Sequence, residues 1–135
     1  MARRSLAGLR VLLTGASSGI GRELAIQLVE QGANVFALAR RQDRLEQLAR
    51  DISRPDQFTF RVADVTNPLH RAEVIQSCRD RWNGLDVLLN NAGSGAIGPF
   101  TASDEARLRQ VMEVNFFAPV ELTRLALPLL RQGNK

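Results

Sequence analysis

The fold is decided by a glycine-rich turn, Thr14-Gly15-Ala16-Ser17-Ser18-Gly19-Ile20-Gly21. An apolar run over residues 10–14 precedes it and is typical of a buried strand, and a helical pattern over residues 20–31 follows it. Gly15 permits a tight exit from the strand, Gly19 lets the backbone approach a pyrophosphate, and Gly21 lets the helix pack closely on the sheet. The helix N-terminus offers free N–H groups to phosphates. The stretch therefore predicts a dinucleotide site, with an ordinary turn as the plainer alternative.

The alternation of strand and helix continues along the chain. Further strands are predicted over residues 35–39, 58–63 and 85–89, and further helices over residues 41–52, 68–82 and 103–130, the last capped by Ser103. Such alternation favours a parallel sheet in the order 3-2-1-4, with ligand at the carboxyl ends beside strand 1. We predict an α/β fold, a partial Rossmann-type doubly wound sheet of about four strands and four helices, forming one domain over residues 1–135. Strand 4, normally interior, would lie at an edge.

The composition of the chain argues against several classes of partner and ligand, including nucleic acid, membrane and metal ions. The net charge is +4, from 18 basic against 14 acidic residues, but the arginines are spread along helical segments without an aromatic-rich basic stripe. We therefore expect solvated helix faces, and no nucleic-acid partner. The sequence has no long uncharged apolar run, so we expect no membrane span. Arg10 interrupts the apolar run that follows Arg3 and Arg4, which argues against a signal peptide. One histidine and one cysteine give no metal-ligand spacing. The lone Cys78 excludes an internal disulfide and fits a reducing cytoplasm.

Four stretches resemble one family in their order and spacing. The turn over residues 14–21 resembles the cofactor turn of the classical short-chain dehydrogenase/reductase family. Asp64-Val65 is similar to that family's adenine-contacting pair, and Asn90-Asn91-Ala92-Gly93 to its NNAG motif beside the adenosine ribose. Asn115 resembles the asparagine of the catalytic tetrad. The resemblance covers essentially the whole chain and implies an oxidoreductase that transfers hydride between a nicotinamide dinucleotide and a carbonyl or alcohol.

The end of the second strand indicates which dinucleotide is bound. Ala39 stands where the family's NAD-preferring members carry an acid for the ribose 2′-hydroxyl, and Arg40 and Arg41 follow it directly. An arginine fork matches the geometry of a 2′-phosphate, so the pair predicts NADP as cofactor. A solvated helix start is the alternative. Ser17 and Ser18 do not supply the base that some NADP-preferring members carry in the first turn.

The expected cofactor site falls into three groups. The pyrophosphate is assigned to the first turn, the 2′-phosphate to the end of strand 2, and the adenosine side to the segments after strands 3 and 4. In that order the residues are Gly15, Ser17, Ser18, Gly19, Ile20 and Gly21; Arg40 and Arg41; and Asp64, Val65, Asn91, Ala92 and Gly93.

Asn115 is the one catalytic candidate. It falls within an apolar stripe of the last helix that runs from Leu108 to Phe116, and Pro119 has no N–H to donate to its carbonyl four residues back. We expect a buried spot where the amide and the freed carbonyl hold an ordered water, as the resemblance implies for the proton relay. A core asparagine that satisfies itself at a kink is the alternative.

The general acid of the family is missing from this sequence. The chain contains no tyrosine, and its only lysine is Lys135, so the Tyr-x-x-x-Lys pair that the resemblance implies is not there. We expect a fragment truncated before strand 5, inactive alone. Two alternatives stay open: a non-catalytic NADP-binding or dimerising module, or an enzyme completed by a second chain. We expect a homo-oligomer that forms through the last helix or the exposed strand edge. The sequence does not indicate the substrate.

Overall fold

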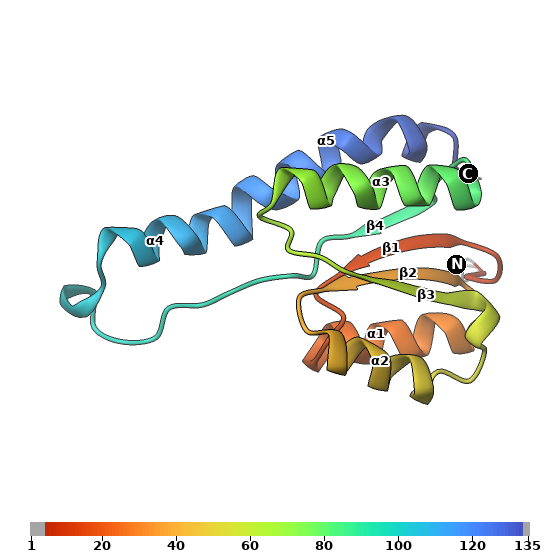
Figure 1. The fold of residues 1–135 in the computed structure, drawn as a ribbon, viewed down its shortest axis with the longest axis horizontal. Helices are drawn as coiled ribbons and strands as arrows, with labels where there is room; N and C mark the ends of the chain where they lie inside the picture. The colour runs from red at the N-terminus through yellow and green to blue at the C-terminus, as the bar shows by residue number, and fades with distance from the viewer. Residues whose placement is uncertain (1–4, 134–135) are drawn as a thin grey trace.

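The structure, a computed structural model, describes residues 5–133 and contains one four-stranded parallel sheet in the order β3-β2-β1-β4. Figure 1 shows helices on both of its faces. The strands are β1 (Arg10–Thr14), β2 (Asn34–Ala39), β3 (Phe58–Val62) and β4 (Val87–Leu89). The predicted fold class and strand order are confirmed. Arg3, Arg4 and Lys135 lie outside the described residues.

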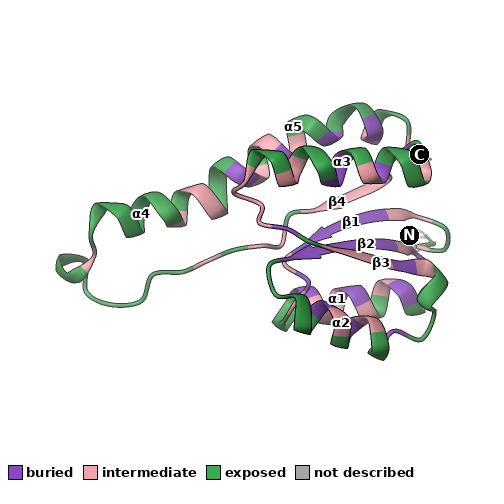
Figure 2. Ribbon diagram, in the orientation of Figure 1, coloured by how far each residue is buried: buried purple, intermediate pink, exposed green. Residues whose placement is uncertain are grey.

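Two pairs of helices cover the sheet. Helices α1 (Gly19–Glu30) and α2 (Gln42–Asp51) lie on one face, and α3 (Pro68–Trp82) and α5 (Ala118–Arg131) on the other (Figure 1). Helix α4 (Glu105–Met112) continues the line of α5 and projects beyond the sheet, where it is largely exposed (Figure 2). Short 3₁₀ turns occur at Pro55–Gln57 and Phe100–Ala102.

The alternation of side chains along each strand divides the core into two layers. Val11 and Leu13 of β1 pack into the cluster formed with α1 and α2, whereas Leu12 packs into the cluster formed with α3 and α5. Each of these three side chains is at most 1% exposed. Burial of one such side chain contributes about 1.5–3 kcal/mol, so the central strand stabilises both layers.

A buried ion pair joins the start of β1 to the segment before β4. The guanidinium of Arg10 meets the carboxylate of Asp86 at 2.9 Å (Nε–Oδ2) and 3.0 Å (Nη2–Oδ1), and the Asp86 side chain is 1% exposed. Strand β4 starts at Val87 and not at Leu85 as expected, because the Leu85 N–H donates to the carbonyl of Leu129 in α5.

The last predicted helix differs from the structure in two ways. Asp104, and not Ser103, is the N-cap, since its Oδ1 accepts the N–H of Arg107 at 2.8 Å. The helix is also divided by a π turn, Glu113–Phe117, directly before Pro119. The Ala118 N–H donates to the carbonyl of Glu113, five residues back. The irregularity thus lies where the missing N–H of proline places it.

Cys78 of α3 is a fully buried free thiol. Burial in apolar surroundings raises its pKa to about 12, because the thiolate would lose its hydration.

Across residues 5–133, none of the helices has both the length and the apolar character that crossing a bilayer requires.

Candidate functional site

A cavity of about 830 Å³ opens at the carboxyl ends of the four strands. It gathers the turn after β1, the end of β2, and the segments that follow β3 and β4, and α4 supplies a further wall. The expected cofactor residues that line it are Gly15, Ser17, Ser18, Ile20, Gly21, Arg40, Arg41, Asp64, Val65, Asn91, Ala92 and Gly93. Gly19 belongs to the same turn but is not among the lining residues, and neither is Asn115.

Two glycines of the first turn are required by close packing. Gly15 has a φ of +72°, and a Cβ on it would lie 2.7 Å from the Cα of Ala92. A Cβ on Gly21 would collide with the carbonyl oxygen of Gly15 and with Nδ2 of Asn91. The turn and the segment after β4 therefore approach each other more closely than any side chain at these positions would allow.

The contact between the first turn and the segment after β4 is stabilised by Thr14, which sequence reasoning did not single out. Its hydroxyl accepts the N–H groups of Asn91 at 3.0 Å and Ala92 at 2.9 Å, and donates to the carbonyl of Leu89 at 3.4 Å. The Asn91 amide in turn donates to the carbonyls of Thr14 at 3.1 Å and Gly15 at 3.3 Å. The only available sequence clue was a polar residue at the end of an apolar strand; Thr14 is 1% exposed.

The N-terminus of α1 faces the cavity without a side-chain cap. Ser18 is the N-cap residue, but its hydroxyl does not bond to the N–H groups of the helix. Instead Nη2 of Arg41 donates to Oγ of Ser18 at 2.7 Å and to Oγ of Ser17 at 3.0 Å. The first turn of α1 contains no acidic residue. Positive charge and a helix N-terminus thus converge on one spot, which favours an anionic ligand.

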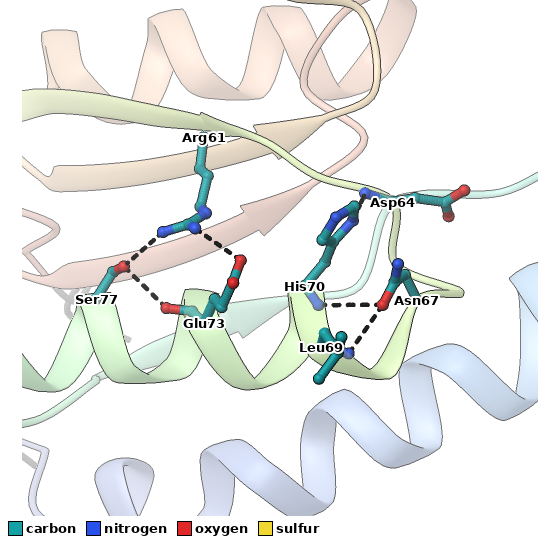
Figure 3. Close-up of polar contacts among 7 residues, drawn as sticks. All are labelled: Arg61, Asp64, Asn67, Leu69, His70, Glu73 and Ser77. Atoms are coloured by element: carbon teal, nitrogen blue, oxygen red, sulfur yellow. Dashed lines mark hydrogen bonds and ion pairs between the residues drawn. The ribbon is translucent and has the colours of Figure 1, made fainter.

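Asp64 follows β3 and lines the same cavity. Partial burial acts to raise the pKa of its carboxyl, but hydrogen bonds from Thr66 and the positive charge of Arg40 outweigh it, so the pKa lies below its ordinary value. Oδ1 of Asp64 accepts the Thr66 N–H at 2.9 Å and its hydroxyl at 2.8 Å. The backbone N–H of Asp64 donates to Nδ1 of His70 at 3.0 Å (Figure 3). The carboxylate is therefore ionised at neutral pH and fixed at the cavity.

Asn115 occupies a different environment from the one expected. It is exposed and not buried, because the stripe around it is itself only partly covered: Met112 and Phe116 are 48% and 52% exposed. Its amide makes a two-point contact with the backbone of Ser94, accepting the N–H at 2.8 Å and donating to the carbonyl at 2.7 Å. The side chain thus anchors the loop after β4.

A second tie to the same loop comes from α5. Nδ2 of Asn90 donates to Oγ1 of Thr123 at 3.0 Å, and that hydroxyl donates to the carbonyl of Pro119 at 2.7 Å. The segment 90–94 is consequently held from three directions, by β1, by the π turn and by α5.

Known proteins resemble this chain in sequence and in fold. A sequence model of the family described as short chain dehydrogenase matches residues 10–135. The 11-beta-hydroxysteroid dehydrogenase 1A of Arabidopsis thaliana is 40% identical over 134 residues, which cover 96% of this chain and 38% of the relative. A short-chain dehydrogenase from Streptomyces avermitilis superposes with a TM-score of 0.85 at 37% identity, covering 93% of this chain and 45% of that one.

L-Sorbose reductase from Gluconobacter frateurii, solved with NADPH and L-sorbose, superposes equally well. Its TM-score is 0.85 at 30% identity, and the match covers 93% of this chain and 49% of the reductase. The chain described here thus spans less than half the length of each of these three proteins.

Proposed function

The chain belongs to the short-chain dehydrogenase/reductase family, and from this premise we propose that it binds NADP(H) along the carboxyl edge of its sheet. In this proposal residues 1–135 form a single domain that is the cofactor-binding part of an oxidoreductase. The cavity at the strand ends supports the proposal, because it brings together the residues expected for all three parts of the cofactor.

The pyrophosphate is assigned to the first turn. The close approach at Gly15 and Gly21 leaves a shallow cradle that a Cβ would fill, and the uncapped start of α1 supplies N–H donors and a partial positive charge. Gly19 has a φ of +55° and nothing within 4 Å of a Cβ position, so its backbone is open to a ligand. The residues present therefore fit a diphosphate.

The single observation that carries the choice of NADP is the position of Arg41. Its guanidinium is held by Ser17 and Ser18, so the cation stands beside the first turn before any ligand arrives. Preorganisation of this kind lowers the entropic cost of binding. Arg40 lies near enough to Asp64 to act on its pKa, and Ala39 presents no acid to repel a 2′-phosphate. We assign the 2′-phosphate to the two arginines together.

The adenosine side of the cofactor is assigned to the segments that follow β3 and β4. The ionised carboxylate of Asp64 can accept from the exocyclic amine of adenine, with Val65 beside it, and Asn91, Ala92 and Gly93, which line the same cavity, are assigned to the ribose. When bound, the cofactor would supply or accept the hydride exchanged with a carbonyl or alcohol carbon. Asn115 holds the loop in place through Ser94.

The chain is proposed to be catalytically silent by itself. It has no tyrosine to act as general acid, a group that typically contributes about 10²–10⁴-fold to the rate. NADPH mixed with the purified chain and a panel of aldehydes and ketones should stay reduced. Turnover that is lost in Asn115→Ala would contradict this. The names of two similar proteins point to different substrates, a hydroxysteroid in one and sorbose in the other. We therefore assign no substrate to this chain.

A second candidate is a module that associates through α4 and α5 and either binds cofactor without catalysis or is completed by another chain. It is favoured by the exposed apolar side chains Phe116, Phe117, Val120 and Leu127.

The buried free thiol of Cys78 is in keeping with the predicted reducing, cytoplasmic compartment.

Calorimetry with NADPH and NADH tests the choice of cofactor. Charge-assisted hydrogen bonds contribute about 1.5–3 kcal/mol, so NADPH should bind about ten-fold or more tightly than NADH. Arg41→Ala and Arg40→Ala should each reduce that ratio, whereas Arg44→Ala, an exposed arginine one turn further along α2, should not. Equal affinities in the unaltered chain would refute the NADP preference, and no binding of either would refute the dinucleotide site.

A further inference from the structure

His70, the only histidine of the chain, lies directly behind Asp64. Its Nδ1 accepts the backbone N–H of Asp64 at 3.0 Å, while the Asp64 carboxylate points away from the imidazole (Figure 3). An imidazole nitrogen can accept only when it carries no proton, so this contact requires the neutral ring with its proton on Nε2. The protonated ring would offer the Asp64 N–H a second donor in place of an acceptor.

The helix that carries His70 is itself firmly placed. Oδ1 of Asn67, the N-cap of α3, accepts the N–H groups of Leu69 at 2.9 Å and His70 at 3.4 Å. One to two turns further along, Arg61 of β3 forms an ion pair with Glu73 at 2.7 Å (Figure 3). Since both ends of this stretch are tied, the position of the imidazole determines where the Asp64 backbone lies.

Charged residues of two elements lie beside the imidazole. Asp64 belongs to the loop after β3 and Arg71 to α3, while α5 contributes the apolar Leu122. Arg40, at the end of β2, acts on the carboxyl of Asp64. Arginine stays charged at all ordinary pH, and the pKa of Asp64 is lowered, so none of these neighbours changes its charge between pH 8 and pH 5. A histidine is the side chain that ordinarily titrates in this range.

We propose that His70 is a positioning residue for the adenosine end of the cofactor, and that its protonation releases Asp64 and weakens cofactor binding. The inference rests on the proposed function, because it concerns the same cavity. Neutral His70 fixes the peptide of Asp64, and the bonds from Thr66 then orient the carboxylate. With the imidazole protonated, the peptide loses its acceptor and the carboxylate loses its fixed direction.

The test compares the pH dependence of NADPH binding in three chains. His70→Asn keeps an acceptor near the place of Nδ1 but does not titrate, and His70→Leu removes the acceptor at every pH. Because the 2′-phosphate of NADPH itself titrates near pH 6, the profile of the Asn variant serves as the reference that carries only the ligand's contribution.

Between pH 8 and pH 5.5, the affinity of the unaltered chain should fall about ten-fold more than that of His70→Asn, which corresponds to the loss of about one hydrogen bond. At pH 8 the Leu variant should bind about ten-fold more weakly than the Asn variant. Parallel profiles for the unaltered and Asn chains would overturn the inference alone. Absence of NADPH binding at pH 8 would overturn the proposed function as well. Equal affinities of the Asn and Leu variants at pH 8 would overturn the positioning role of the acceptor, even if acid unfolds the chains.

Discussion

The guanidinium of Arg41 donates to the hydroxyl of Ser18 across 2.7 Å, although the two residues are separated by a strand and a helix. The contact carries positive charge from the end of β2 into the turn before α1, whose own residues contain no base. A serine at this N-cap would ordinarily bond to the helix backbone. Here it holds a cation beside the helix N-terminus, and the N–H groups of α1 are left for a ligand.

Removing the serine hydroxyl should therefore weaken the binding of phosphate-bearing cofactor. In Ser18→Ala, Arg41 loses one of its two acceptors and with it part of its fixed position. NADPH should bind about five-fold more weakly, which corresponds to about 1 kcal/mol, while NADH should change less. Calorimetry with both cofactors gives the two ratios, with Ser53→Ala at an exposed position as control. An equal loss for NADH would show that Ser18 contacts the shared part of the cofactor instead.

Gly21 should be intolerant of even one added methyl group. Gly21→Ala places a Cβ against the Gly15 carbonyl and the Asn91 amide, so the turn or the segment after β4 must move. Overpacking of this kind costs about 1–3 kcal/mol, which urea unfolding measures directly. Gly95→Ala is the matched control, since nothing lies within 4 Å of its Cβ position. Equal stabilities of the two variants would contradict the close approach.

The lowered pKa of Asp64 predicts how stability depends on acid. Its folded pKa lies below the unfolded value of about 3.9, so its contribution is fully present above that value and is lost as the pH falls through the folded pKa. Asp64→Asn should reduce the free energy of unfolding at pH 7 and flatten its decline between pH 5 and 3. Urea titrations across that range test this, with the exposed Asp56→Asn as control. An unchanged slope in Asp64→Asn would refute it.

The exposed apolar surface of the π turn and α5 should associate with another chain. Phe116 and Phe117 stack edge-to-face with centroids 5.2 Å apart, and each is about half exposed. Patches of this kind favour contact with another chain, so light scattering should give a dimer or larger species. Phe117→Glu should shift the mass towards the monomer, whereas Ile97→Glu, on an exposed loop, should not. A monomer at high concentration in the unaltered chain would contradict the prediction.

Local patterns were enough to predict the bounds of the strands and helices to within a residue, or two at the start of β4, apart from the last helix. Strands β1 and β2 are buried on both faces and appear as unbroken apolar runs, and Pro68 and Trp82 bound a helix found at those residues. The turn at Gly15 could also be predicted, because glycine adopts the positive φ found there without the steric cost that a Cβ brings.

Contacts between distant segments could not be predicted in this way. Thr14 bonds to Asn91, 77 residues later, and nothing in the neighbourhood of either residue specifies the partner. The same holds for Arg41, whose interaction with Ser18 depends on where β2 ends relative to α1. Asn115 was expected to be buried because an apolar stripe surrounds it in sequence; burial also needs a covering element, and the described residues provide none over Phe116.

Because Cys78 is buried, its reactivity towards thiol reagents depends on local opening of the fold. As the sole thiol, with its pKa raised to about 12, it is shielded from alkylating reagents while α3 stays packed on the sheet. Labelling can then proceed only through molecules in which that layer has transiently separated. The rate at which a thiol reagent labels Cys78 therefore measures how often this layer opens. A ligand that binds at the strand ends should lower that rate without contacting the cysteine.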